Sequence, residues 1–521
     1  MSERNRSAAL KLALICIPIF IGALDLTVVS AVLPHVIFDL EIPLDTGLDT
    51  AAWLVTGYLL AYTVSMTFMG RLSDLYGRQR VFLVALVIFA IGSYLVAVAA
   101  EWPTDLALRG YHLFFSGRPD LSYTSLYVLI AARMIQAFGA GSMVPVGMAM
   151  VGDLFPEGKR ARPLGLIAAV DTAGWVVGHL YGGIVVRYFD WQTIFWLNLP
   201  ICLVAYLLIA RLLRSPERTA KGSMDWPGAI LIAASLALLN LALGSGSESS
   251  SAAAFGEQAT ITQYVVPLLI AAAALFILFL VRQRMTKEPL VDLSLFRKLN
   301  FLPATLANLL LGVGMFIAIA NVPLFINSFI AATPNEGAWE SGWVLSALTV
   351  PMALAAIPGG WLAERRGYRV PLAVGVVLAV LGFSLMSTWT RTSDYWVMVP
   401  HLMLTGIGFG LSMAPVASAV VDAAPAWQRG TSSALVIVFR LVGMTVGVSG
   451  ITTYGLRRFE ALRAEAFSGG TDLSQGAQGG LQIMQQVIGE TFWIAGGITA
   501  LVLVAVLFLK PFYAKREGSN A

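Results

Sequence analysis

The sequence predicts an all-α integral membrane protein whose fourteen transmembrane helices form two six-helix bundles joined by two inserted linker helices. Three observations support this fold class. Of the 521 residues, 57% are hydrophobic and 12% are charged, whereas soluble domains contain about 45 to 50% and about 25% of these classes. Fourteen apolar runs reach the roughly 20 residues that a spanning helix needs. Two distant segments of the chain also repeat one pattern.

The apolar runs fall into two groups of seven, each run bounded by charges, glycine or proline. The first seven runs are residues 10–37, 50–69, 81–100, 125–151, 163–186, 192–213 and 226–244. The second seven are residues 264–281, 301–326, 342–363, 370–389, 396–423, 431–456 and 491–509. An even number of spans places both ends of the chain on the same side of the membrane.

The distribution of lysine and arginine predicts which side this is. Segments on the side of the N-terminus hold 25 of the 34 basic residues, and the opposite loops hold 7. Basic residues concentrate in cytoplasmic loops. We therefore expect a multi-pass protein of the inner or plasma membrane with both termini in the cytoplasm. The basic residues form no continuous stripe, which argues against a nucleic-acid partner.

An internal repeat divides the chain. Residues 70–77, GRLSDLYG, recur at 360–367 as GWLAERRG, an offset of 290. A second echo, at an offset of 269, pairs Gly139, Gly141, Asp153, Pro156 and Arg160 with Gly408, Gly410, Asp422, Pro425 and Arg429. The offsets differ because the first half has a long outer loop over 101–124.

The repeat predicts three units. These are an N-terminal six-helix bundle over 1–213, two linker helices with an amphipathic connection over 214–300, and a C-terminal six-helix bundle over 301–521. Two related halves with a substrate site between them are typical of transporters.

Four motifs carry a resemblance to a known family. Residues 70–80, GRLSDLYGRQR, resemble the signature loop of the major facilitator superfamily, and residues 133–139, RMIQAFG, are similar to its fourth-helix motif. Residues 22–34, GALDLTVVSAVLP, and 288–301, EPLVDLSLFRKLNF, resemble segments of its 14-helix drug:proton antiporters. Within the family, the segments RMIQAFGAGSMVPV, IFWLNLP and FRLVGMTVGVSGITTYGLRRFEAL resemble those of mycobacterial triacylglyceride exporters. These exporters work with a periplasmic lipoprotein and are also described as drug efflux pumps. The resemblance implies the major facilitator fold.

The fifth-helix antiporter motif of the family shows one departure. The family pattern is G-x-x-x-G-P-x-x-G-G; here Gly174, Gly178, Gly182 and Gly183 match it, but His179 replaces the proline. The glycines still permit close helix packing, while the kink that proline gives is in doubt. His179 can relay protons near neutral pH, or it is a structural residue of a packed helix.

Asp25 and Arg133 are the first candidate pair for coupling. An ionisable group near the bilayer centre costs at least about 2.5 to 3.5 kcal/mol and is usually functional. At about 1.5 Å per residue, the two reach a similar depth in the first and fourth spans. We interpret Asp25 as the proton-carrying acid, because an adjacent arginine favours the ionised carboxylate and loss of water favours the protonated one. The alternative is a static pair that holds the two helices together.

Asp171 and Arg440 are the second candidate pair. They lie at similar depth in the fifth and thirteenth spans, in opposite halves. This favours an inter-half lock that forms in one access state and breaks in the other, and the resemblance to the lipid exporters implies the same. Each residue can instead be satisfied within its own half.

The two signature loops are predicted to form a gate. Asp74 is an acid beside a helix amino terminus, where exposed N–H groups favour negative charge. The resemblance implies that it braces the inner gate against the helix that begins near Thr431; otherwise these charges only orient the chain. The predicted gate residues are Gly70, Asp74, Gly77 and Arg78 in the first copy and Glu364 and Arg365 in the second.

No catalytic constellation is present in the sequence. The four histidines have no metal-ligand spacing, and there is no G-x-x-x-x-G-K-[ST] segment for ATP. We therefore expect no enzyme activity, no metal and no cofactor. The energy source is then an ion gradient, such as protons, or the gradient of the substrate itself.

Two features bear on the cargo. The run that starts at 431 has no proline up to 467, and as one helix it would be about 55 Å long in a ~30 Å core. We expect a helical hairpin outside the membrane over about 457–490; the alternative is an amphipathic pair lying on the outer leaflet. The cavity helices offer an adaptable apolar lining or only packing residues, namely Met143, Met148, Met315, Phe316, Met403, Phe409 and Met413.

These features predict a proton-coupled, alternating-access exporter of lipophilic or amphipathic molecules. Lipids such as triacylglycerides and drugs are the rival cargoes, and a periplasmic lipoprotein carrier is the expected partner of a monomeric protein. The alternative is a lipid-exchange transporter that delivers lipid to a periplasmic carrier without strict proton coupling. A third hypothesis is a non-transporting receptor or scaffold, for which both signature loops would be dispensable.

Overall fold

The computed structural model describes residues 3–42, 48–114, 117, 119–213, 222–244, 264–330, 334–467 and 473–510. Within these ranges the secondary structure consists of helices, without a strand. Thirteen of the described helices are long and apolar enough to cross a membrane. The remaining predicted run is also helical and forms α2 (Leu48–Tyr76). The predicted all-α membrane fold is confirmed.

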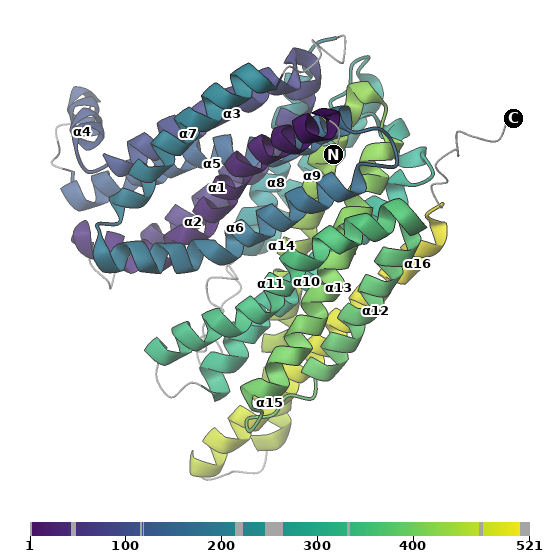
Figure 1. Ribbon diagram of the computed structural model, residues 1–521. Helices are drawn as coiled ribbons and strands as arrows, with labels where there is room; N and C mark the ends of the chain where they lie inside the picture. Colours follow the sequence, from purple (N-terminus) through teal and green to yellow (C-terminus); the bar gives the residue numbers. More distant parts are fainter. Residues whose placement is uncertain are drawn as a thin grey trace, which may run out of the picture.

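The helices form two groups and a connecting pair (Figure 1). The first group, the N half, contains α1 (Glu3–Asp39), α2, α3 (Arg78–Ala97), α4 (Trp102–Phe114), α5 (Leu121–Leu154), α6 (Ala161–Tyr188) and α7 (Gln192–Leu212). The linker pair is α8 (Trp226–Gly244) and α9 (Val265–Met285), followed by the short η2 (Leu293–Arg297). The second group, the C half, contains α10 (Phe301–Phe329), α11 (Pro334–Arg366), α12 (Arg369–Met386), α13 (Tyr395–Ala423), η3 (Ala426–Gln428), α14 (Arg429–Phe467), α15 (Leu473–Ala500) and α16 (Val502–Phe508).

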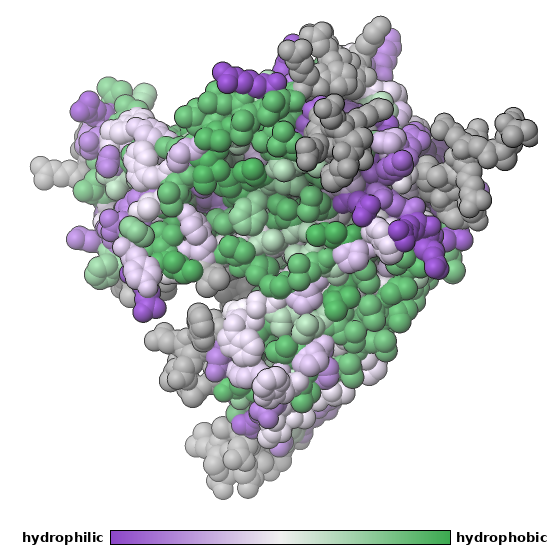
Figure 2. All heavy atoms as spheres, in the orientation of Figure 1, coloured by the Kyte–Doolittle hydropathy of each residue, from purple (hydrophilic) through white to green (hydrophobic). Residues whose placement is uncertain are grey.

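The two halves meet at one end of the molecule. We call this the termini end, because α1 begins there and Lys510 follows α16 there; the opposite side is the far end (Figure 1). From the termini end the two halves diverge toward the far end (Figure 1). Figure 2 shows a broad band of apolar side chains over both halves, with polar residues gathered toward the ends. Such a band is what lipid contact requires, because the helices satisfy their own backbone hydrogen bonds.

The segment 101–124, which we expected to be a loop, contains a helix, so this expectation was wrong. It forms α4 at the far end of the N half (Figure 1). The Thr104 hydroxyl donates to the Ala99 carbonyl over 2.7 Å and fixes the start of the helix. Trp102, Leu106 and Leu113 remain exposed along it. These three residues lie within about 40° of each other on a helix, so their spacing could have indicated an amphipathic helix.

Helix α14 runs unbroken over 39 residues and projects with α15 beyond the rest of the C half at the far end (Figure 1). The turn between them, residues 468–472, lies outside the described residues. Phe459 of α14 and Met484 of α15 are buried in the shared apolar core. Arg458 donates to the Glu490 carboxylate over 3.0 Å and adds a charged contact between the two helices.

Candidate functional site

Asp25 lies in the middle of α1 and is fully buried. Its Oδ2 accepts a hydrogen bond from Arg133 Nη1 of α5 over 2.5 Å, and Arg133 Nη2 donates to the Asp25 backbone carbonyl over 3.2 Å. The structure therefore brings the first predicted pair together, entirely within the N half. A buried charge without a partner is costly to the folded protein, so each of the two charges stabilises the other.

A second layer of polar residues holds the Asp25 carboxylate. Its Oδ1 accepts from Gln136 Nε2 over 3.1 Å and from Asn198 Nδ2 of α7 over 3.4 Å. Both amides also donate to Ser93 Oγ of α3, over 2.7 and 3.2 Å. Charge-assisted hydrogen bonds of this kind strengthen one another in a low-dielectric interior. Four helices thus converge on one carboxylate.

Sequence reasoning missed Gln136, Asn198 and Ser93. A signal was present for two of them: Gln136 follows Arg133 by three residues, on the same helix face, and Asn198 interrupts the apolar run of α7. Nothing in the sequence indicates Ser93, because isolated serines are common in spanning helices.

Aromatic rings enclose the Arg133 guanidinium. Its central carbon lies 4.2 Å from the ring centroid of Tyr58 and 5.7 Å from that of Phe195. The negative faces of aromatic rings attract a cation, and the Tyr58 hydroxyl donates to the Gly22 carbonyl over 3.4 Å. These contacts fix the arginine in place beside Asp25.

The glycines of the fifth-helix motif bring α6 close to α1. A methyl group on Gly174 would lie 2.7 Å from the Ala23 methyl group, and one on Gly178 would overlap the Thr27 hydroxyl. Thr27 Oγ1 donates to the Trp175 carbonyl of α6 over 2.9 Å. Gly182 is buried, whereas Gly183 faces open space. The side chain of His179 lies outside the part of the structure that is described.

Asp171 and Arg440 form an ion pair across the two halves. Arg440 Nη2 of α14 lies 3.3 Å from Asp171 Oδ2 of α6; the Asp171 side chain is buried and that of Arg440 is partly buried. A cavity of about 30 Å³ adjoins them, lined also by Asn308, Met148 and Met413. Within the described residues, Asp171 Oδ1 has no hydrogen-bond partner. A space of this size holds one water molecule.

The predicted apolar lining is only partly present. Met148 and Met413 line the small cavity beside Asp171, but Met143 is fully buried. Phe409 packs edge-on against Phe383 of α12, with ring centroids 5.9 Å apart. Phe409 is therefore a packing residue, the second of the two alternatives, because its side chain fills the core of the C half.

Asp74 is placed at the amino terminus of α14. Its carboxylate accepts hydrogen bonds from the backbone N–H groups of Gly430, over 2.9 Å, and Thr431, over 3.1 Å. Arg78 Nη2 donates to the same carboxylate over 3.0 Å. A carboxylate at this position is stabilised by the unpaired N–H groups and by the helix dipole. The signature loop of the N half thus caps a helix of the C half.

Gly70 makes the approach of α2 to α14 possible. A methyl group on Gly70 would overlap the carbonyl oxygen of Gly430. Gly77 has a φ of +97°, in the region that favours glycine, and it separates α2 from α3. Both predicted glycines therefore have backbone roles at the termini end.

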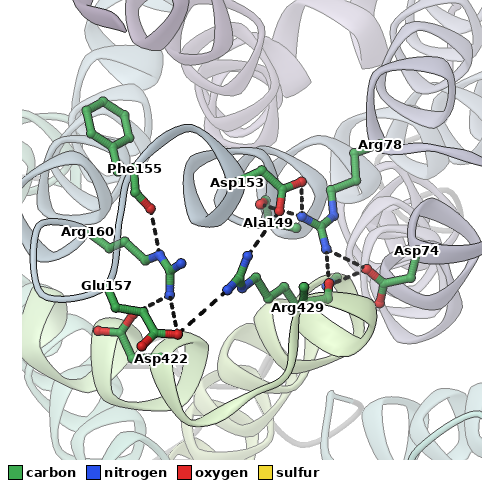
Figure 3. Close-up of polar contacts among 11 residues, drawn as sticks. Asp74, Arg78, Ala149, Asp153, Phe155, Glu157, Arg160, Asp422 and Arg429 are labelled. Carbon is green, nitrogen blue, oxygen red and sulfur yellow. Dashed lines mark hydrogen bonds and ion pairs between the residues drawn. The ribbon is translucent and has the colours of Figure 1, made fainter. Parts of the chain in front are cut away.

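Arginine and aspartate residues at the helix ends bind across the same contact (Figure 3). Asp153, at the end of α5, is ion-paired with Arg78 and with Arg429 of α14. Arg160, at the start of α6, lies 2.7 Å from Asp422 at the end of α13. Arg78 also donates to the Ala426 carbonyl of the C half over 2.6 Å.

The second signature copy is weaker. Glu364 accepts from the backbone N–H of Arg162 at the start of α6, over 3.0 Å, and so caps α6 as Asp74 caps α14. Arg365 points elsewhere: its guanidinium lies 4.0 Å from the Trp361 ring centroid. Tyr368 stands where the repeat places an equivalent of Arg78, and its hydroxyl donates to Asp422.

Comparisons with known proteins agree with this architecture. The chain matches the Major Facilitator Superfamily over residues 15–448, with a second match over 304–520. It is 31% identical to a triacylglyceride transporter of Mycolicibacterium hassiacum, covering 94% of this chain and 90% of that protein. It is 30% identical to a probable triacylglyceride transporter of Mycobacterium leprae, covering 86% and 84%. Among solved structures, the proton:xylose symporter XylE shares the fold at 13% identity, with a TM-score of 0.60 and coverage of 96% and 95%.

Proposed function

We propose that this chain, which belongs to the major facilitator superfamily, is a proton-coupled exporter of lipophilic or amphipathic molecules. It is a multi-pass membrane transporter and not an enzyme. The excess of basic residues on the side of the termini supports a place in the inner or plasma membrane with both termini in the cytoplasm.

The observation that carries the coupling proposal is the burial of Asp25. A carboxylate in the centre of a spanning helix, held by Arg133 and by two amides, is maintained at a large desolvation cost. A change of water access around it can exchange its bond to Arg133 for a proton. Asp25 is thus the proton carrier of the proposal, and the Arg133 guanidinium stabilises the negative charge of the Asp25 carboxylate when the proton leaves.

The contact between the halves supports alternating access. With the termini in the cytoplasm, the structure is closed at the cytoplasmic side by the gate around Asp74 and by the Asp171–Arg440 lock. Opening this side requires these contacts to break, and contacts at the far end must then form and close that side instead. The polar groups of the broken contacts can form hydrogen bonds with water, so the contacts can break and re-form between two states.

The relatives and the projecting hairpin support a lipid cargo. The named relatives are triacylglyceride transporters, and α14 and α15 extend beyond the far end of the C half (Figure 1). Such an extension suits hand-over of lipid to a periplasmic carrier protein, with the transporter acting as a monomer. Drugs are the second cargo class, because an apolar binding site favours lipophilic molecules without requiring one particular chemical structure.

The experiment uses purified full-length protein in liposomes. A fluorescent triacylglyceride and ethidium are followed side by side under an imposed pH gradient, for the wild type, Asp25→Asn and, as a matched control, Asp105→Asn on exposed α4. We expect gradient-driven lipid movement that Asp25→Asn abolishes and Asp105→Asn retains. Lipid movement that is unchanged by Asp25→Asn and by collapse of the gradient would instead indicate exchange without coupling. Movement of ethidium alone would assign the protein to drug efflux.

A further inference from the structure

One cavity lies away from Asp25 and away from the contact between the halves. It has a volume of about 800 Å³ and is formed where α1, α3 and α6 end and α7 begins. All four of these helix ends belong to the far end of the N half, on the left of Figure 1. The volume is in the range of small-molecule sites, which is about 300 to 1,000 Å³.

The cavity is predominantly acidic. Three carboxylates line it, those of Asp39, Glu101 and Asp190, beside one imidazole, that of His35, and no lysine or arginine does. Within the described part of the chain, none of the three forms an ion pair. Asp39 Oδ2 is oriented by Trp191 Nε1 and Gln192 Nε2, which each donate to it over 3.1 Å. The cavity therefore presents uncompensated negative charge, part of it held in a fixed position.

Four aromatic rings also line the cavity. Phe38 and Phe189 are 86% and 65% exposed, and Trp191 and Trp196 add two indole rings. Large exposed rings beside carboxylates are the arrangement that binds organic cations, because ring faces attract positive charge while their area contacts an apolar body. A neutral lipid would leave the three carboxylates without a counter-charge. An inorganic cation would leave the four rings without an apolar contact.

A further polar atom is without a partner at this site. Gln192 Oε1 is buried and accepts no hydrogen bond from the described residues, while the same side chain lines the cavity. The positive charge of a bound cation would stabilise the oxygen end of this amide dipole.

We propose that this cavity binds a small organic cation with an apolar body, at a site separate from the proton-coupling pair. The occupant neutralises part of the charge of Asp39, Glu101 and Asp190 and places its apolar groups against the four rings. The proposal does not depend on the direction or coupling of transport, because it concerns equilibrium binding at the far end.

The test measures binding without any gradient. Tetraphenylphosphonium is titrated into purified full-length protein in nanodiscs, with triphenylphosphine oxide as the neutral probe of similar shape. We compare the wild type, the double variant Glu101→Gln and Asp190→Asn, the variant Trp196→Ala, and the control Asp105→Asn. The double variant leaves Asp39 and its two hydrogen bonds intact, and thermal unfolding verifies that each variant is folded.

We expect saturable binding of the cation that weakens about tenfold in the double variant and with added salt, weakens in Trp196→Ala, and is unchanged in Asp105→Asn. The neutral probe should bind weakly to all of them. Cation binding that is equal in the wild type and both cavity variants would overturn the proposal. Failure of tetraphenylphosphonium to bind the wild type would also overturn it.

Discussion

Arg160 of the N half and Asp422 of the C half form an ion pair of 2.7 Å. The equivalent residues of the repeat form a second pair, in which the C half supplies the arginine and the N half the aspartate. Residue 160 plus the offset of 269 is Arg429, and residue 153 plus the same offset is Asp422. Arg429 of the C half accordingly binds Asp153 of the N half over 3.2 Å. Each half thus offers one arginine and one aspartate to the other, and the termini end closes through reciprocal pairs (Figure 3).

The two pairs are not equivalent, because Arg78 also binds Asp153 of the Arg429–Asp153 pair, whereas Tyr368 binds Asp422 of the Arg160–Asp422 pair. Arg78→Gln should remove a charge from between Asp74 and Asp153 and lower the free energy of unfolding by about 3 to 5 kcal/mol. Tyr368→Phe removes one hydrogen bond to Asp422 and should cost about 1 kcal/mol. Thermal unfolding in detergent measures both. Equal effects would show that the asymmetry has no energetic consequence.

Asp171 and Arg440 give a charge-swap prediction. Asp171→Asn or Arg440→Gln alone should weaken the closed termini end and reduce transport by roughly tenfold, about 1.4 kcal/mol. The exchanged double variant, Asp171→Arg with Arg440→Asp, should recover part of the activity because the pair is reformed across the halves. Liposome transport measures the three variants. An exchanged variant no better than either single one would argue that each residue acts within its own half.

A substitution at Gly70 should change the solvent access of the termini end without changing any charge. Gly70→Ala should hold the termini end open, because the added methyl group overlaps the Gly430 carbonyl in the closed form. Labelling of a cysteine introduced at Thr431 should increase several-fold in this variant. Gly497→Ala is the matched control, since its methyl group would meet open space. The same labelling rate in both would contradict the steric argument.

Part of this site could be predicted from the sequence and part could not. Equal depth in the membrane was sufficient to predict that Asp25 meets Arg133, because a buried charge requires a partner. The echo of Asp153 and Arg160 in Asp422 and Arg429 was also visible, but a constant offset shows only that positions are equivalent. It does not show that equivalent residues bind each other, which depends on how the halves are rotated together.

The fold was predictable for a related reason, and its exceptions have physical causes. Lipid excludes unpaired backbone groups, so apolar runs of sufficient length can only be helices. At the water boundary this constraint disappears, and α4 was missed there. Asn198 was missed because a single amide in an apolar run can bind polar groups on any of several neighbouring helices. Only the convergence of α1, α3, α5 and α7 assigns it to Asp25.

The contacts of Asp225 predict that the packing of the two linker helices, α8 and α9, against each other depends on pH. Burial raises the pKa of its carboxyl group, but hydrogen bonds from Arg282, Gln283 and the Gly228 N–H outweigh burial and hold the pKa below its usual value. Because the folded-state pKa is the lower one, the stabilisation is present above the unfolded pKa, about 3.9, and is lost as pH falls through the folded one.

Asp225→Asn should therefore lower the melting temperature at pH 7, and its difference from the wild type should shrink as the pH falls below about 4. Thermal unfolding across this pH range checks the prediction, with Asp105→Asn as the exposed-carboxylate control. A difference that stays constant with pH would show that the charge of Asp225 does not stabilise the linker pair.

Phe459 connects the stability of the projecting hairpin with delivery of cargo. It is 8% exposed and lies in the apolar core that also contains Met484 and Ile488 of α15. Phe459→Ala should cost about 3 to 5 kcal/mol locally and increase hydrogen exchange in the outer parts of α14 and α15, without affecting the pair around Asp25. Lipid transfer to an outer acceptor should then fall while gradient-driven movement of ethidium persists.

Arg463→Ala, on the exposed side of α14, is the control. If lipid transfer survives although exchange shows the hairpin to be loosened, the hairpin has no part in hand-over, and the lipid leaves through the opening between the two halves instead.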